Sequence, residues 1–205
     1  MTSVLILLLA AYLLGSVSGS LLLGRLRGVD IRTQGSGNAG GTNALRTQGW
    51  KFALGTVIVD VGKGVLAAWL ALRFGRDFAW SPYAAVLAAI CGHVWPVFHG
   101  FRGGKGAGTL IGGLLLLWPW ALLPVLAVWI LSLGLGGYVG LSTVLAVATL
   151  PVFALVPPVD AIRLLFGFAV SLLIVFTHRA NLARLRAGTE HRFERARFLR
   201  RRRSA

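Results

Sequence analysis

Residues 52–72, with the sequence FALGTVIVDVGKGVLAAWLAL, are apolar over the length that a helix needs to cross a bilayer, roughly 20 residues. Comparable stretches lie at residues 4–23 and 80–97. The chain is 56% hydrophobic and 13% charged, with a mean hydropathy of +0.76, which is too apolar for an ordinary soluble domain. The sequence therefore predicts an all-α integral membrane protein, with one domain over residues 1–205.

A long apolar region, residues 109–177, must be divided into several helices. The break signals are Trp118-Pro119-Trp120, a glycine cluster at 134–137 and Val156-Pro157-Pro158, because proline lacks a backbone donor and glycine weakens a helix interior. They predict helical pieces near residues 109–118, 120–133, 138–155 and 161–177. Seven transmembrane helices are favoured in all, and five are the alternative, with one pair merged and another re-entrant.

The basic residues predict the orientation of the helices. Five of them lie in the segment 24–51, namely Arg25, Arg27, Arg32, Arg46 and Lys51. Basic loops stay on the cytoplasmic side, so the N-terminus is expected outside and the C-terminus, with a basic tail at about 191–205, inside. The net charge of +15 is explained by this rule and by anionic lipid headgroups, so no nucleic-acid partner is expected.

The first of three polar, glycine-bearing segments has the sequence GSGNAGGTN over residues 35–43. Successive glycines let backbone N–H groups turn inward as an anion-binding nest, and Arg46 offers two-pronged contact to phosphate oxygens. No Walker motif is present, and a flexible connector is the alternative. The expected phosphate ligands are Ser36, Gly37, Asn38, Gly40, Gly41, Thr42, Asn43 and Arg46.

Two charged residues interrupt the apolar stretch 52–72. Asp60 and Lys63 are about one helical turn apart and hence on the same face. A structural ion pair is one interpretation. In the other, Lys63 faces the cytoplasmic site and binds phosphate, with Asp60 holding its position.

The second segment is GHVWPVFHGFRGGKG, residues 92–106. Gly103, Gly104 and Gly106 flank Lys105, whose ammonium can therefore approach a ligand with little steric hindrance. His93 by itself is as consistent with a buried, hydrogen-bonded histidine as with a functional one, and we expect it to support the site.

The third segment, HRANLARLRAGTE at 178–190, follows the last apolar run. His178, Asn181 and Arg184 recur at helical spacing, which places imidazole, amide and guanidinium on one face at the membrane surface. An ordinary interfacial helix end is the alternative. Functionally, the face offers donors for a second anionic group and a proton acceptor, with Arg179, Gly188 and Glu190 in support.

Several kinds of chemistry are disfavoured by the sequence. The six acidic residues form no cluster with histidine at metal-ligand spacing, and no Gly-x-Ser-x-Gly elbow or Ser-His-Asp arrangement is visible. We therefore expect no metal, no cofactor and no acyl-enzyme. The lone Cys91 is expected to serve packing.

Taken together, the three segments resemble those of the bacterial acyl-phosphate-dependent glycerol-3-phosphate acyltransferases. All three motifs occur in order, and the resemblance covers nearly the whole chain; Gly41 and Arg102 depart from it, where Ala and Lys are the usual residues. The resemblance implies seven helices and transfer of a fatty acyl group from acyl phosphate to the sn-1 hydroxyl of glycerol 3-phosphate, which gives lysophosphatidic acid and inorganic phosphate. This reaction begins membrane phospholipid synthesis.

The resemblance also implies a bacterial inner-membrane location and a functional link to an enzyme that makes acyl phosphate. In the mechanism we expect, the acyl phosphate group lies in the first segment with Arg46, and glycerol 3-phosphate lies against Lys105, His178, Asn181 and Arg184. The reverse distribution of the two phosphates is the alternative. Either His178 or a phosphate oxygen of the donor accepts the hydroxyl proton. A small anion or phosphate transporter is the competing function, because transporters also place glycines and cations at broken helices.

Overall fold

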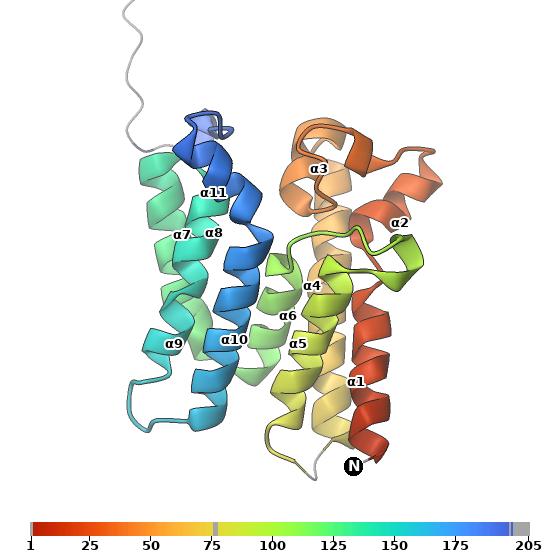
Figure 1. Ribbon diagram of the computed structural model, residues 1–205, viewed down its shortest axis with the longest axis vertical. Helices are drawn as coiled ribbons and strands as arrows, with labels where there is room; N and C mark the ends of the chain where they lie inside the picture. The colour runs from red at the N-terminus through yellow and green to blue at the C-terminus, as the bar shows by residue number, and fades with distance from the viewer. Residues whose placement is uncertain (1, 76–77, 197, 199–205) are drawn as a thin grey trace, which may run out of the picture. The chain divides into compact units, whose positions relative to one another are not determined.

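The computed structural model describes residues 2–75, 78–196 and 198, and their regular structure is helical throughout (Figure 1). The chain forms two compact units, Met1–Pro119 and Trp120–Ala205. Residues 197 and 199–205 of the predicted basic tail lie outside the described residues.

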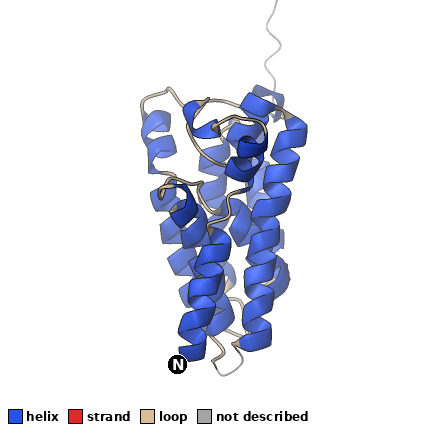
Figure 2. Cartoon of the chain, turned by 90° about the vertical axis from the view of Figure 1, so that its right-hand side faces the viewer, coloured by secondary structure: helices blue, strands red, loops and turns tan. Residues whose placement is uncertain are grey.

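The first unit contains most of the predicted site. Its elements are α1 (Thr2–Gly15), α2 (Gly19–Leu26), η1 (Ile31–Thr33), α3 (Gly41–Gln48), α4 (Trp50–Phe74), α5 (Ser81–Val94), η2 (Val97–His99) and α6 (Ala107–Leu117). In Figure 2, where strands would appear red, the described residues are drawn with helices and connecting loops alone. The central helix α4 packs against α1, α5 and α6.

Small residues let the helices of the first unit approach closely. A side chain at Gly64 of α4 would collide with the Thr109 backbone of α6, and one at Gly15 of α1 would collide with the Ala89 backbone of α5. Alanines fill the same layer, with Ala67 and Ala71 fully buried. In a bilayer, where lipid tails are as apolar as leucine, such close backbone packing holds helices together.

The apolar stretch 4–23, expected as one helix, is instead broken between α1 and α2, which form a bent pair with an angle of 47°. The physical reason is a polar break: the Ser16 hydroxyl donates to the Tyr12 carbonyl, and the carbonyls of Gly15 and Val17 accept from a side chain, Lys63, instead of continuing the ladder. The segment 24–51, expected as a loop, also contains a helix, α3.

The second unit follows the predicted break signals closely. It contains α7 (Leu122–Gly136), α8 (Val139–Val147), α9 (Thr149–Phe153), α10 (Ala161–Thr177) and α11 (Arg179–Arg186), preceded by η3 (Pro119–Ala121) and followed by η4 (Glu194–Ala196). Gly137, with φ of 81°, ends α7, and the Asp160 carboxylate caps α10. The piece expected at 138–155 is interrupted at Ala148.

Three described segments are long and apolar enough to cross a membrane: α4, Ser81–His99 and Pro119–Gly136. Two bent pairs, α1 with α2 and α10 with α11, each qualify as one broken span, and α6 and Val139–Phe153 are shorter apolar helices. The protein therefore has the helices of an integral membrane protein. Seven crossings, with the N-terminus outside, stay a prediction.

Candidate active site

The first glycine segment is organised by the side chain of Asn43, which is buried at 1% exposure. Its Oδ1 accepts from the Ser36 N–H at 2.9 Å, and its Nδ2 donates to the carbonyls of Ile31 and Gln34 at 3.2 and 3.0 Å. Asn43, expected as a phosphate ligand, thus uses its amide to hold the loop. Gly35 and Gly37, at φ of 55° and 71°, make the turns that this closure needs.

The same segment leads directly into the N-terminus of α3. Gly40 is the extended N-cap residue, without a side-chain cap, so the first N–H groups of the helix, at Gly41 and Thr42, have no intrahelical acceptor. A helix N-terminus carries a partial positive charge that favours anions. Ser36 is exposed beside this loop and Arg46 is half-buried in the last turn of α3.

The second glycine segment folds back over the end of α5. Gly103 N–H donates to the Val94 carbonyl at 3.1 Å and Gly104 N–H donates to the His93 carbonyl at 3.0 Å. Gly106, with φ of 91°, is the N-cap of α6, a backbone conformation that favours glycine. Half-buried Lys105 therefore lies immediately before a second helix N-terminus.

The two glycine segments meet at Gly104. A Cβ atom built there would lie 3.0 Å from the carbonyl oxygen of Ala39 and would collide with the His93 ring. Only glycine fits this contact without displacing a neighbour. The structure therefore brings residues 36–43 and 103–106, predicted separately as phosphate-binding, into one place within the first unit.

Beneath this contact lies a buried polar network of Asp60, Lys63 and His93, each at most 4% exposed. The Lys63 ammonium is 3.1 Å from Asp60 Oδ1 and 2.8 Å from His93 Nδ1. It also donates to the carbonyls of Gly15 and Val17 at 2.8 and 2.9 Å. The Lys63 ammonium is thus enclosed by protein groups. This arrangement favours the interpretation of Asp60 and Lys63 as a structural ion pair.

The network also reaches the start of α2, where the Gly19 N–H donates to Asp60 Oδ1 at 3.2 Å. It therefore joins three parts of the unit: the break between α1 and α2, the middle of α4, and the end of α5. His93 contacts Gly104 with its ring and accepts the Gly104 N–H at its carbonyl. The network therefore fixes the position of the residue on which the two glycine segments meet.

The third segment belongs to the second unit. His178 lies at the junction of α10 and α11, a bend of 55°, and its Nδ1 is 2.8 Å from the Ile174 carbonyl. A carbonyl only accepts, so Nδ1 is the protonated nitrogen, and in the neutral ring Nε2 is the basic nitrogen. Nε2 is therefore the nitrogen of this ring that can accept a proton.

Glu190 is the centre of the remaining contacts in that segment. Its two carboxylate oxygens accept from Asn181 Nδ2 at 2.6 Å and Arg184 Nε at 2.7 Å, after a turn at Gly188 with φ of 69°. Asn181 and Arg184, expected to bind an anionic group, here share a carboxylate. Arg179 is exposed and lies 4.2 Å from the centre of the Phe176 ring.

The sequence did not reveal the roles of two kinds of residue. Asn43 and Glu190 organise their segments through several hydrogen bonds each, whereas composition alone suggested a ligand and a generic support. The contact of Ala39 with Gly104 also had no sequence signal, because it depends on tertiary packing. Among the described residues, no group of three or more His, Cys, Asp or Glu side chains is placed to hold a metal.

Comparison with known proteins identifies the family. The profile of the family described as glycerol-3-phosphate acyltransferase matches residues 5–188. The chain belongs to this family. A glycerol-3-phosphate acyltransferase of Trichlorobacter lovleyi is 40% identical over 95% of this chain and 100% of its own length.

Solved structures agree with the family assignment. The crystal structure of PlsY, an integral membrane glycerol 3-phosphate acyltransferase, is similar in its glycerol 3-phosphate form, with a TM-score of 0.87, 37% identity, and coverage of 93% of this chain and 96% of that one. Its lysophosphatidic acid form has a TM-score of 0.84, 36% identity, and coverage of 93% and 95%. The resemblance to the PlsY family is thereby confirmed: the chain is a membrane acyltransferase of this type.

Proposed function

We propose that this enzyme transfers a fatty acyl group from acyl phosphate to the sn-1 hydroxyl of glycerol 3-phosphate. The hydroxyl oxygen bonds to the carbonyl carbon and the bond from that carbon to the phosphate oxygen breaks. The hydroxyl proton is taken by a proton acceptor and then passes to the departing phosphate. The products are lysophosphatidic acid and phosphate. The observation that carries the proposal is the contact at Gly104, which unites two glycine segments, each leading into a helix N-terminus.

Acyl phosphate suits these residues because it is already activated. A mixed anhydride with a good leaving group needs neither a metal nor a protein nucleophile, so positioning and charge stabilisation suffice. In our assignment the donor phosphate binds Ser36, the Gly37–Thr42 backbone and Arg46. Lys105, with its flanking glycines, binds the phosphate of glycerol 3-phosphate, and the reverse distribution of the two phosphates is the alternative.

We assign the proton-accepting role to Nε2 of His178. The hydrogen bond from Nδ1 to Ile174 supports this assignment, because it fixes the tautomer with a basic Nε2. Asn181 and Arg184 keep their proposed role near an anionic group, with Glu190 holding both side chains in place. A phosphate oxygen of the donor is the alternative acceptor.

We further propose seven crossings of a bacterial inner membrane, with the N-terminus outside and the site on the cytoplasmic side. The proposal counts the two shorter apolar helices as crossings, in addition to the three long spans and the two bent pairs. The arginines of segment 24–51 support the orientation. A reaction that makes acyl phosphate must supply the donor from the same compartment.

The donor is tested by comparing two acyl compounds. Purified protein in a lipidic medium is given glycerol 3-phosphate with either palmitoyl phosphate or palmitoyl-CoA, and lysophosphatidic acid is quantified by mass spectrometry. The proposal predicts product from palmitoyl phosphate and none above background from palmitoyl-CoA. Equal product from both donors would contradict the proposed acyl-phosphate donor.

A further inference from the structure

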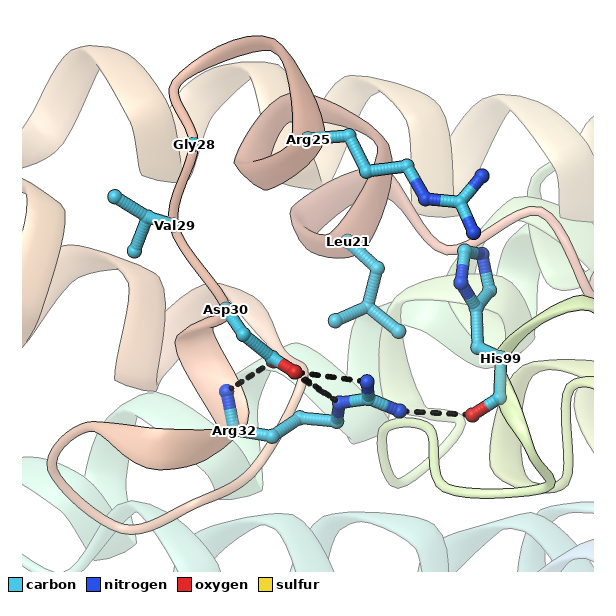
Figure 3. A pocket seen from close by; sticks show the side chains of 7 residues that line it. All are labelled: Leu21, Arg25, Gly28, Val29, Asp30, Arg32 and His99. Atoms are coloured by element: carbon cyan, nitrogen blue, oxygen red, sulfur yellow. Dashed lines mark hydrogen bonds and ion pairs between the residues drawn. The ribbon is translucent and has the colours of Figure 1, made fainter.

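A polar cavity lies in the first unit, between the end of α2 and η2. Its volume is about 330 Å³. It is lined by Leu21, Arg25, Val29, Asp30, Arg32 and His99 (Figure 3). None of its charged residues belongs to the set that we assign to acyl transfer.

The cavity carries a net positive charge. The Arg32 guanidinium donates two hydrogen bonds to the Asp30 carboxylate, from Nη2 to Oδ2 at 2.8 Å and from Nε to Oδ1 at 3.0 Å. These hydrogen bonds lower the pKa of Asp30, so the carboxylate stays ionised and its charge is balanced. Figure 3 shows the guanidinium of Arg25 directed toward the His99 ring. Among the described residues, no hydrogen bond or ion pair engages that guanidinium, so its charge is available.

The cavity lies beyond the end of α5, since His99 follows that helix, and near the start of α4, since Leu21 packs with Phe52. Exposed aromatic side chains lie on the same turn as the lining residue His99: Trp95, Phe98 and Phe101 are 38%, 53% and 57% exposed. Phe101 has φ of 58°, which is rare for a bulky residue and marks a turn held against its preference. Exposed aromatic rings beside cations are typical of the headgroup region of a bilayer.

We propose that this cavity binds the phosphate group of an anionic membrane lipid. Arg25 supplies a charge-assisted contact and the His99 ring a second donor, while the aromatic turn contacts the acyl chains. Free inorganic phosphate could make the same contacts with Arg25 and His99. The exposed aromatic residues favour a lipid, because only a lipid has acyl chains for them to contact.

The cavity is also connected to the second glycine segment. Arg32 Nη1 donates to the carbonyls of His99 and Arg102 at 2.8 and 3.2 Å, and Gly103 follows directly. The salt bridge from Asp30 therefore fixes one wall of the cavity and the start of the loop that carries Lys105. A lipid bound at Arg25 lies beside this connection.

The test uses the full-length protein in detergent and native mass spectrometry with dioleoyl phosphatidic acid or dioleoyl phosphatidylcholine. Wild type should bind phosphatidic acid more tightly. Arg25→Gln should weaken that binding about tenfold, the loss expected for one hydrogen bond to a charged group. Arg27→Gln is the matched control, since Arg27 lies over the Phe52 ring outside the cavity and should leave binding unchanged. His99→Gln gives an independent second variant.

Two further arms separate the sources and the sites. Lys105→Ala should keep phosphatidic acid binding, because that residue belongs to the reaction site, and inorganic phosphate should compete only weakly. Equal weakening by Arg25→Gln and Arg27→Gln, or no preference for phosphatidic acid, would overturn the proposal. Full competition by inorganic phosphate would overturn the lipid as ligand. These experiments measure lipid binding and not activity. A negative result would therefore reject the lipid site without bearing on the proposed acyl transfer.

Discussion

His178 is the residue whose proposed role has the sharpest kinetic consequence. Replacing it by Ala removes the basic Nε2, and we expect kcat to fall about a hundredfold or more, the usual contribution of a general base, with KM for glycerol 3-phosphate little changed. Steady-state kinetics on purified protein measure both parameters. His191→Ala is the control, since that histidine is exposed. Turnover near wild type in His178→Ala would assign the proton to the donor phosphate.

Lys105 differs from His178 because its proposed role is binding. Lys105→Ala removes a charge-assisted contact to phosphate, so KM for one anionic substrate should rise about tenfold or more. Titrating glycerol 3-phosphate at saturating palmitoyl phosphate, and the reverse, shows which phosphate it binds. Lys51→Ala is a control of equal charge change, on an exposed lysine 5.8 Å from the Trp50 ring centre. Unchanged kinetics in both titrations would remove Lys105 from the site.

At the scale of elements, the contact between the glycine segments depends on the absence of one side chain. Gly104→Ala puts a methyl group against the His93 ring and the Ala39 carbonyl, so the segments must separate and kcat/KM should fall by at least about tenfold. The control is Gly62→Ala in α4, where a Cβ meets nothing within 4 Å. Equal activity of the two variants would show that the segments do not need this contact.

The buried network should matter for stability because it joins several elements. Lys63→Met leaves Asp60 without its cation in an apolar interior, and removal of one partner from a buried pair costs about 3–5 kcal/mol. A lower Tm in detergent is expected, with partial recovery in Asp60→Asn combined with Lys63→Met. If the single variant melts like wild type, the network does not hold the break between α1 and α2.

The sequence predicted helix ends well where helix-breaking residues are clustered. Proline and glycine at 118–120, 134–137 and 156–158 correctly predicted the ends of α6, α7 and α9. The break at residues 16–18 was missed although the sequence Gly-Ser-Val-Ser-Gly-Ser at 15–20 marks it, and the side chain that binds its carbonyls, Lys63, lies far along the chain. Asp60 with Lys63 was recognised as a pair, whereas its connection with His93 required the packing of α4 against α5.

For the whole molecule, the distribution of basic residues predicts the orientation in the membrane. In a Cys91→Ser background, Thr33→Cys reports the end of α4 that carries the site, and Trp80→Cys reports the opposite end; both positions are exposed. We expect an impermeant maleimide to label Trp80→Cys in intact spheroplasts and Thr33→Cys only after lysis. The reversed pattern would place the arginines of segment 24–51 outside.

The competing function at this scale is movement of phosphate across the membrane. A transporter would carry radiolabelled phosphate into sealed proteoliposomes without changing any covalent bond. For an acyltransferase we expect no such uptake above that of empty liposomes. Uptake that saturates with phosphate would favour the transporter.

Acyl transfer from acyl phosphate is tested most directly by phosphate release from palmitoyl phosphate by purified protein, measured with and without glycerol 3-phosphate. We predict release that depends on glycerol 3-phosphate and matches the lysophosphatidic acid formed, one for one. Release without the acceptor, or none from a folded sample, would contradict acyl transfer from acyl phosphate.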